Sequence, residues 1–442
     1  MGKVNFKKAI AGILAVATLS SVCFGCANTE AASSGSASGA ASKAATTAKT
    51  KVTFWYLWSG DTVATINNMV KDYNSKSDKY EVTALSVPDS QKITAAISAG
   101  NGPDVTDDFS SNVGKMAAAG IMEPLDDYIS KTKYDVDDFI PAALDSCKLN
   151  GKTYALPVNI NLSALYYNKT LLKAAGYTNP PKTMEEMYEM AVKGTKVNSD
   201  GTIKTLGFPD FPNVYYLSAF TAAAGGGWYT SDGKAAAADN EGNKTALDLI
   251  RNYRQKFGVA NIQKFSSGGK YLDPTDPFLM GNQLFRIDGP WMGKNIKETF
   301  KVNVDYGVTY VPYPAAHPEF EGRSFASSSI LFVTGNSKNK EGAFDFTAYV
   351  CGKQGQIDFT IKGGDFPARK SLLDNADFKK SYDSDFYAKM AENKNLTGLP
   401  NNAKSGEYNT YCNEQTELCM NLKQDVATTL KNINKKGTEL LK

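Results

Sequence analysis

Apolar and polar residues alternate along most of the chain in the two periods that mark strands and helices. An apolar run at residues 52–58 has the length of a buried strand, and residues 62–75 carry apolar side chains at helical spacing. Residues 81–87 predict a second strand, residues 91–99 a second helix, and residues 103–105 a third, short strand. Strands that alternate with helices predict parallel pairing with helices on both faces of a sheet, which is an α/β fold.

The same alternation continues through the rest of the chain. It predicts further extended segments at 154–168, 283–287, 306–311 and 329–333, and helices at 184–193, 244–257, 340–351 and 412–441. Parallel α/β sheets bind ligands at the carboxyl ends of their strands, so the loops at 58–61, 88–89 and 107–112 are the expected place for a site.

The first 50 residues follow a different pattern. Lys3, Lys7 and Lys8 precede an uncharged run of fourteen residues, 9–22, which is too short to span a bilayer of about 30 Å. Residues 1–25 therefore predict a secretory signal peptide. Residues 26–50 are rich in Ala, Ser, Thr and Gly, contain no aromatic residue, and predict a flexible linker.

Cys26 follows Gly25, and this junction resembles the bacterial lipobox, in which the Cys is acylated and becomes the first mature residue. Cys23 stands where the lipobox usually carries Leu, Val or Ile. The resemblance implies a lipid anchor on Cys26, and cleavage without lipid is the alternative.

The composition is that of a soluble globular protein, because 42% of the 442 residues are hydrophobic and 21% are charged. The signal peptide holds three of the 49 Lys and Arg residues, which leaves 46 against 46 acidic residues in the body. A body without net charge disfavours nucleic-acid binding and electrostatic membrane binding. A single histidine, His317, and the absence of a phosphate-loop motif predict neither a metal nor a cofactor.

Four cysteines remain in the body, at spacings that match no metal or redox motif. We interpret Cys147, Cys351, Cys412 and Cys419 as buried thiols, and a disulfide between Cys147 and Cys351 stays open.

Seven segments, in order, carry a family resemblance: Val52-Thr-Phe-Trp-Tyr-Leu-Trp-Ser-Gly, Ala99-Gly-Asn-Gly-Pro-Asp-Val105, Gly151-Lys-Thr-Tyr-Ala-Leu-Pro157 with Leu165-Tyr-Tyr-Asn-Lys169, Pro180-Pro-Lys-Thr-Met184, Asp288-Gly-Pro-Trp291, Asp305-Tyr-Gly-Val308 and Phe366-Pro-Ala-Arg-Lys370. Together they resemble the family 1 extracellular solute-binding proteins, the sugar-receptor lipoproteins of ABC importers that share the maltose-binding-protein fold.

The resemblance implies a two-lobed, type II periplasmic-binding-protein-like fold with three crossings and a ligand cleft between the lobes. The crossings map near 156–161, 311–314 and 363–367, where Pro and Gly residues gather. The N-terminal lobe would hold 51–157 and 314–364, and the C-terminal lobe 158–313 and 365–442. The resemblance also implies a monomer that is anchored by lipid on the extracytoplasmic face of the membrane and works with ABC permease subunits.

A sugar site needs aromatic faces for the C–H faces of the ring and polar groups for the hydroxyls. The Trp of the Asp288 motif packs against sugar in the family, and other candidates sit at glycine loops, at strand ends or where relatives place similar groups. The aromatic candidates are Trp58, Tyr216, Trp228, Trp291 and Tyr408. The polar candidates are Asp61, Asp89, Asp108, Ser111, Asn112, Asn159, Asn161, Asp288 and Arg369. For the aromatic residues a place in the core is the alternative, and for the acids helix capping, a brace for the local turn or a solvated charge.

The function predicted in this way is capture of a carbohydrate, without chemistry, for an ABC importer. A secreted glycosidase or lyase that pairs Asp108 with Asp288 is the alternative. A surface lipoprotein without a ligand is a third hypothesis.

Overall fold

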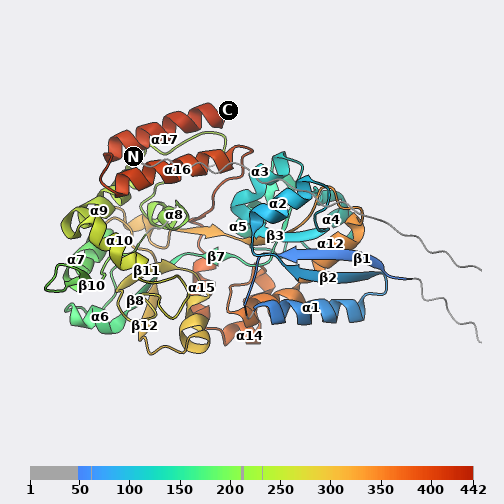
Figure 1. The fold of residues 1–442 in the computed structure, drawn as a ribbon, viewed down its shortest axis with the longest axis horizontal. Coiled ribbons are helices and arrows are strands. Elements are labelled where there is room, and N and C mark those ends of the chain that lie inside the picture. Colours follow the sequence, from blue (N-terminus) through green and yellow to red (C-terminus); the bar gives the residue numbers. More distant parts are fainter. Residues whose placement is uncertain (1–47, 61, 211–213, 231, 442) are drawn as a thin grey trace, which may run out of the picture. The chain divides into compact units, whose positions relative to one another are not determined.

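The computed structural model describes residues 48–60, 62–210, 214–230 and 232–441, which form helices and several sheets (Figure 1). The predicted leader, Cys26 and Asp61 lie outside the described residues. Within the described part of the chain, no helix combines the length and the apolar character that crossing a membrane requires.

The first sheet has the strand order β2-β1-β3-β14-β6. Its strands are β1 (Thr50–Tyr56), β2 (Tyr80–Ser86), β3 (Val105–Phe109), β6 (Leu156–Pro157) and β14 (Ser329–Val333). β1 pairs in parallel with β2 and β3, as the alternating pattern predicts. β14 runs antiparallel to both β3 and β6, because the chain reaches it from another sheet rather than through a crossover helix.

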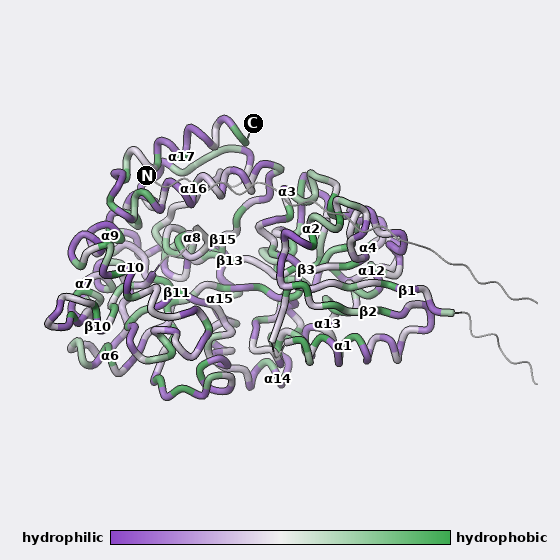
Figure 2. The backbone as a smooth tube through the Cα atoms, viewed as in Figure 1, coloured by the Kyte–Doolittle hydropathy of each residue, from purple (hydrophilic) through white to green (hydrophobic). Residues whose placement is uncertain are grey.

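Helices α1 (Thr62–Lys76) and α12 (Lys340–Val350) pack along this first sheet. The apolar face of α1 buries Ile66, Met69, Val70 and Tyr73. The Tyr73 hydroxyl donates to Asp345 Oδ2 at 2.6 Å, which joins the two helices. Figure 2 shows hydrophilic and hydrophobic residues alternating along α1, which is the pattern of a helix with one buried face.

The second sheet has the order β11-β8-β12 and is antiparallel throughout, so parallel pairing was a wrong expectation here. It consists of β8 (Ala164–Asn168), β11 (Phe285–Asp288) and β12 (Tyr306–Thr309). More than a hundred residues, which include several helices and short strands, separate β8 from β11. A long helical excursion lets the chain return in either direction, so the period of the pattern does not decide the pairing.

The other helices are α2 (Ser90–Ser98), α3 (Val113–Ala118), α4 (Asp126–Thr132), α5 (Pro141–Asp145), α6 (Lys169–Ala174), α7 (Met184–Gly194), α8 (Val214–Ala223), α9 (Glu241–Phe257), α10 (Val259–Ser267), α11 (Met292–Lys294), α13 (Lys353–Gly355), α14 (Ala376–Lys379), α15 (Ser384–Ala391), α16 (Ser405–Met420) and α17 (Val426–Leu440). Short 3-10 or π-helical turns are η1 (Ser110–Asn112), η2 (Asn295–Thr299), η3 (Pro318–Phe320), η4 (Gln356–Ile361) and η5 (Lys370–Leu372). The remaining strands are β4 (Lys148–Leu149), β5 (Lys152–Thr153), β7 (Asn161–Leu162), β9 (Lys196–Val197), β10 (Ile203–Thr205), β13 (Ser324–Ser327) and β15 (Leu396–Thr397).

Two large groups of buried apolar residues form the core. The first core cluster lies under β1, β14, α1 and α12 and continues to Met292, Ile296 and Phe366. The second core cluster lies among α7, α8, α9, α16 and α17, around residues such as Phe220 and Tyr253. The helical region expected at 412–441 consists of two helices, α16 and α17, which pack on each other in this cluster.

Three segments that lead from one sheet to the other lie side by side. The Val158 amide donates to the Ser329 carbonyl at 2.9 Å, and the Ile160 amide donates to the Phe366 carbonyl at 3.0 Å. Asn159 and Pro367 also form an isolated bridge. Residues 158–160 and 366–367 belong to the segments in which the resemblance places the first and third crossings.

The second crossing segment is longer than expected. Tyr313 is bridged to Thr183 beside α7, and Phe325 is part of the second core cluster. The chain then enters the first sheet at β14, so the residues from 313 to 325 pack with the second cluster rather than with the first.

The loop between β15 and α16 contacts two segments that are far apart in the sequence, residues 146–148 and Gly233. Asn401 Nδ2 donates to the carbonyls of Ser146 and Lys148 at 2.7 and 3.0 Å, and Asn402 Nδ2 donates to the Gly233 carbonyl at 3.3 Å. A side chain at Gly114 would meet the Asn402 carbonyl at 2.3 Å, so glycine is required where this loop passes α3. We call residues 398–404 the bridging loop.

Cys147, Cys351, Cys412 and Cys419 are all buried free thiols, which confirms that interpretation and leaves the disulfide between Cys147 and Cys351 unformed.

Candidate functional site

Trp291 is partly exposed at the end of the second sheet. It follows β11 through Asp288-Gly-Pro, and its ring lies so close to Gly289 that a side chain there would meet the ring at 2.3 Å. The Tyr166 hydroxyl donates to the Gly289 carbonyl at 3.0 Å and holds the turn. The glycine of the motif is therefore needed because the ring folds over the backbone.

A chain of polar contacts fixes the indole from behind. Trp291 Nε1 donates to the Tyr271 hydroxyl at 2.8 Å, and that hydroxyl donates to Asp288 Oδ1 at 3.0 Å. Arg286 lies 3.0 Å from Asp288 Oδ2 and 2.5 Å from Asp276 Oδ1. Burial raises the pKa of Asp288, and the charge of Arg286 opposes that rise. Asp288 therefore braces the turn and positions Trp291 instead of facing a ligand.

Tyr271 is a candidate site residue that sequence reasoning missed. It is 45% exposed, and its ring lies 5.0 Å from the Arg286 guanidinium. Burial of its hydroxyl and then the charges of Asp288 and Tyr216 raise its pKa, so the candidate Tyr216 lies close to it. Tyr271 lies in a polar loop that does not follow a predicted strand, so no sequence pattern marked it as a binding residue. The structure groups Tyr216, Tyr271 and Trp291 together.

Trp58 stands at the end of the first sheet and is also partly exposed. Its ring lies 4.7 Å from that of Phe359, and its carbonyl accepts from Ser86 Oγ at 2.8 Å. Both Trp58 and Trp291 pack against the first core cluster, although they come from different sheets. The crossing segments contribute Phe359 and Phe366 to this same cluster.

Asn159 and Asn161 both lie buried in the first crossing. Asn159 Oδ1 accepts from the Ser329 amide at 2.8 Å, and Asn161 is paired with Ser327 through β7 and β13. Next to Asn159 stands Asp365 of the third crossing, whose carboxylate interacts with the Asn159 side chain. An acid directly after Gly363 and Gly364 in a crossing segment was a signal that sequence reasoning did not use.

The acidic residues that were predicted as ligand groups at the first sheet accept hydrogen bonds from residues close to them in the sequence. Asp89 is the N-cap of α2 and accepts from the amides of Gln91 and Lys92. Asp108 Oδ1 accepts from the Phe109 amide and from Asn112 Nδ2, both at 2.6 Å, and Ser90 Oγ donates to Oδ2 at 3.1 Å. Asn112 and the partly exposed Ser111 form η1 beside them. These groups brace the rim of the sheet and leave Asp108 buried.

Trp228 and Tyr408 are core residues, contrary to the expectation that they stack on sugar. Trp228 is 2% exposed and its Nε1 donates to Ser218 Oγ at 2.9 Å. Tyr408 is fully buried, and its hydroxyl donates to the Trp228 carbonyl at 2.9 Å. The glycines before Trp228 leave it uncovered locally, but α8 and α16 bury it.

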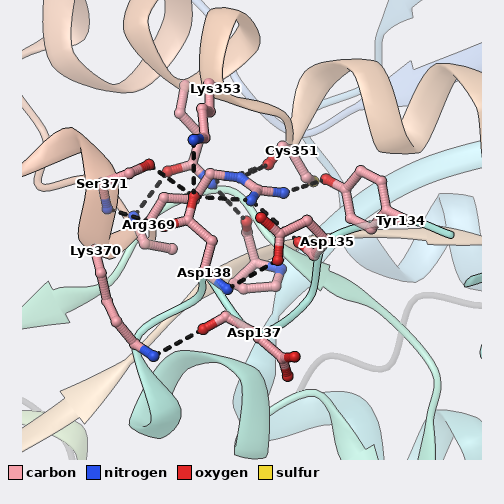
Figure 3. A network of polar contacts seen from close by, with 12 residues as sticks. Tyr134, Asp135, Asp137, Asp138, Cys351, Lys353, Arg369, Lys370 and Ser371 are labelled. Carbon is pink, nitrogen blue, oxygen red and sulfur yellow. Dashed lines mark hydrogen bonds and ion pairs between the residues drawn. The ribbon is translucent and has the colours of Figure 1, made fainter.

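Arg369 is also buried rather than available to a ligand, and Figure 3 shows the polar contacts that it makes. Its Nε donates to the Cys351 carbonyl at 2.8 Å, and Nη2 donates to the Tyr134 hydroxyl at 2.7 Å. Nη1 lies 3.2 Å from Asp138 Oδ2, which also accepts from Ser371 Oγ at 2.7 Å. This arginine network joins the third crossing to the segment before α5.

The two carboxylates of the hydrolase alternative do not form a catalytic pair of the expected kind. Both Asp108 and Asp288 are buried, and the contacts described above engage both groups. The geometry therefore does not favour the alternative.

The family model described as "Bacterial extracellular solute-binding protein" matches residues 68–384. The chain belongs to the bacterial extracellular solute-binding proteins. The resemblance drawn from the seven segments is thus confirmed.

Among the relatives of this solute-binding protein, the maltotriose-binding protein of Pyrococcus abyssi (strain GE5 / Orsay) is 26% identical over 304 residues. That match covers 68% of this chain and spans 62% of the relative's length. The sn-glycerol-3-phosphate-binding periplasmic protein UgpB of Brucella melitensis biotype 1 is 22% identical, over 88% of this chain and 93% of its own length.

Solved structures of similar proteins share the fold. CpMnBP1 with mannotriose bound has a TM-score of 0.75 and 25% identity, and the match covers 88% of this chain and 100% of that one. The GacH receptor of Streptomyces glaucescens has a TM-score of 0.73 at 22% identity, with 89% and 99% covered. The two-lobed α/β fold predicted for this solute-binding protein is confirmed by these neighbours.

Proposed function

We propose that this protein captures an oligosaccharide between its two lobes and delivers it to the permease of an ABC importer. The observation that carries the proposal is the partly exposed aromatic group Tyr216, Tyr271 and Trp291, with Trp58 on the same core cluster. Aromatic rings held by hydrogen bonds offer flat faces of the kind that sugar C–H faces pack against. Relatives named for maltotriose and mannotriose binding support this class of ligand.

The proposed division into lobes keeps residues 51–157 in the N-terminal lobe and residues 158–313 and 365–442 in the C-terminal lobe. The contacts of residues 313–325 with the second core cluster favour a boundary near Ser327 in place of 314. Ligand groups then come from both lobes, with Trp58 on one and Trp291 on the other. Ligand binding would favour closure, because full contact needs both sets.

The proposed location is the extracytoplasmic face of the bacterial membrane, held there by lipid on Cys26 as a monomer. We expect mass spectrometry of membrane-extracted protein to find a mature chain that begins at Cys26 and carries acyl chains. A Cys26→Ser variant should be released from the membrane fraction. An unmodified N-terminus at another residue would contradict the anchor without affecting the sugar-binding proposal.

Replacement of Trp291 by alanine should weaken oligosaccharide binding by at least about tenfold, roughly 1.4 kcal/mol, because a stacking face is lost. Calorimetric titration with maltotriose and mannotriose measures this. Tyr177→Ala is the matched control, since it removes another partly exposed ring, one that packs under Lys193.

Unchanged affinity in Trp291→Ala, together with a large fall in melting temperature, would make Trp291 a core residue and the site misplaced. The same sugars incubated with the protein should remain intact, and new reducing ends would favour the hydrolase alternative.

A further inference from the structure

Asp365 occupies an unusual place in the third crossing. Its amide donates to the Thr360 carbonyl at 2.9 Å and ends η4, and Gly364 before it has a φ of +91°. The turn therefore requires glycine at 364, and Asp365, the residue that follows it, is partly exposed. The side-chain partners that act on this carboxylate among the described residues are Asn159 and Lys294.

These partners leave much of the hydrogen-bond acceptor capacity of the carboxylate unused. Asn159 Oδ1 already accepts from the Ser329 amide, so its amide group is left to donate to Asp365. Lys294 Nζ donates to the Lys362 carbonyl and acts on Asp365 through its charge. A carboxylate can accept about four hydrogen bonds. Burial raises the pKa of Asp365 to about 6, and Asn159 and Lys294 oppose that rise only in part.

The segment around Asp365 contacts residues next to both half-buried tryptophans. A side chain at Gly364 would meet Lys294 Cδ at 2.7 Å, and Lys294 ends the short helix that follows Trp291. On the other side, Phe359 of η4 contacts the ring of Trp58. The carboxylate is thus placed in the crossing region that both aromatic sets border.

Two arginines of the candidate site, Arg286 and Arg369, are already neutralised. Arg286 is paired with Asp276 and Asp288, and Arg369 is paired with Asp138. A phosphate-bearing solute would meet the like charge of Asp365, beside which Lys294 is the cation already engaged, and neither Arg286 nor Arg369 is free to bind the phosphate.

We propose that Asp365 accepts hydrogen bonds from the hydroxyls of an uncharged carbohydrate and thereby selects against phosphorylated solutes. This inference rests on the proposed function and names a specificity-determining residue for it. A neutral sugar supplies the missing donors, whereas an anion adds a like charge. The comparison is relevant because one relative, UgpB, is named for binding sn-glycerol 3-phosphate.

Calorimetry on the full chain with maltotriose, mannotriose and sn-glycerol 3-phosphate tests the proposal. The wild type should bind a neutral sugar and give no measurable binding with sn-glycerol 3-phosphate. Asp365→Asn keeps the shape but loses acceptors, so its affinity for the same sugar should fall at least about tenfold. Asp374→Asn removes an exposed carboxylate that is paired only with Lys379 and should leave affinity unchanged.

A pH series separates this role from a structural one. The pKa of Asp365 in the folded protein is about 6, which is above its ordinary value. Between about pH 4 and pH 6 the folded protein therefore holds a proton on Asp365 that the unfolded chain has lost. The free energy of unfolding decreases as pH rises through this range. Asp365→Asn should therefore raise the melting temperature of the ligand-free protein by about 2 °C at pH 7.5 and leave it unchanged at pH 4.5. Sugar affinity of the wild type should weaken between pH 7.5 and 5, and that of the variant should not.

The outcomes are distinct. If the wild type binds neither sugar, the proposed function fails. If it binds a sugar and Asp365→Asn binds equally well, the role of Asp365 is overturned while the function stands. A melting temperature that falls in Asp365→Asn at both pH values would make the carboxylate a structural brace, and tight binding of sn-glycerol 3-phosphate by the wild type would overturn the selectivity.

Discussion

Replacement of Arg369 by methionine is expected to lower the free energy of unfolding by about 3–5 kcal/mol, since it removes one partner of a buried ion pair. The guanidinium is 2% exposed and lies 4.1 Å from the Phe139 ring centre, so its charge has little access to water. Its loss would remove the charged partner of Asp138, which keeps the hydrogen bonds from Ser371, and one of the two donors to the Cys351 carbonyl. Urea denaturation at pH 7 measures the change.

Lys370→Met is the matched control for this variant. Lys370 follows Arg369 directly, but it is exposed, and its Nζ donates only to the Asp137 carbonyl. Its replacement should cost less than about 1 kcal/mol. If the two variants lose the same stability, the arginine network is not what holds the third crossing.

The Arg369 contribution should also depend on pH. Desolvation raises the pKa of Asp138, but the hydrogen bonds from Ser371 and Arg369 outweigh it, so the pKa is lowered overall. A lowered folded-state pKa stabilises the fold above the ordinary carboxyl range, and this contribution is lost as pH falls through the folded value. The difference between wild type and Arg369→Met should therefore shrink in acid.

Trp228→Ala should lower the free energy of unfolding by about 3–5 kcal/mol, because it opens a cavity in the second core cluster. The indole is buried, donates to Ser218, and lies beneath Tyr408. Differential scanning calorimetry of the ligand-free protein measures the loss. Because the ring faces no solvent, sugar affinity at a temperature where the variant is folded should change less than threefold.

Trp291→Ala is the opposite case, because we expect it to lower the affinity for sugar and to change the free energy of unfolding little. If Trp228→Ala instead loses affinity and keeps its melting temperature, the ring faces a ligand in solution and the core assignment is wrong.

The pattern of apolar residues predicted most of the regular elements, because burial on one face imposes a period. The helices expected at 62–75 and 91–99 are α1 and α2, and the strand expected at 329–333 is β14. β3 was misplaced because two acids, Asp107 and Asp108, lie within it. Strand propensity disfavours aspartate, but Asp107 Oδ1 accepts from the Leu57 amide at 2.8 Å, and this tertiary contact overrides the preference.

The site was harder to predict, because exposure depends on parts of the chain far away in sequence. Trp291 and Trp228 both follow glycine-containing turns, yet only Trp291 reaches the surface, since α16 returns to cover Trp228. Arg369 and Asp288 have the chemistry of sugar ligands, but each finds a buried partner of opposite charge. Sequence alone indicates which residues can bind sugar, and the long-range packing determines which do so.

The bridging loop has a consequence for how affinity is set. Under the proposed division, its hydrogen bonds to Ser146, Lys148 and Gly233 join the lobes outside the three covalent crossings. An opening motion that separates these partners has to break the hydrogen bonds between them. The loop therefore raises the fraction of ligand-free molecules that are closed. A receptor that already spends more time closed binds all its ligands more tightly in equal proportion. Substitutions in residues 398–404 would thus adjust the concentration at which the receptor fills while leaving its preference among sugars intact.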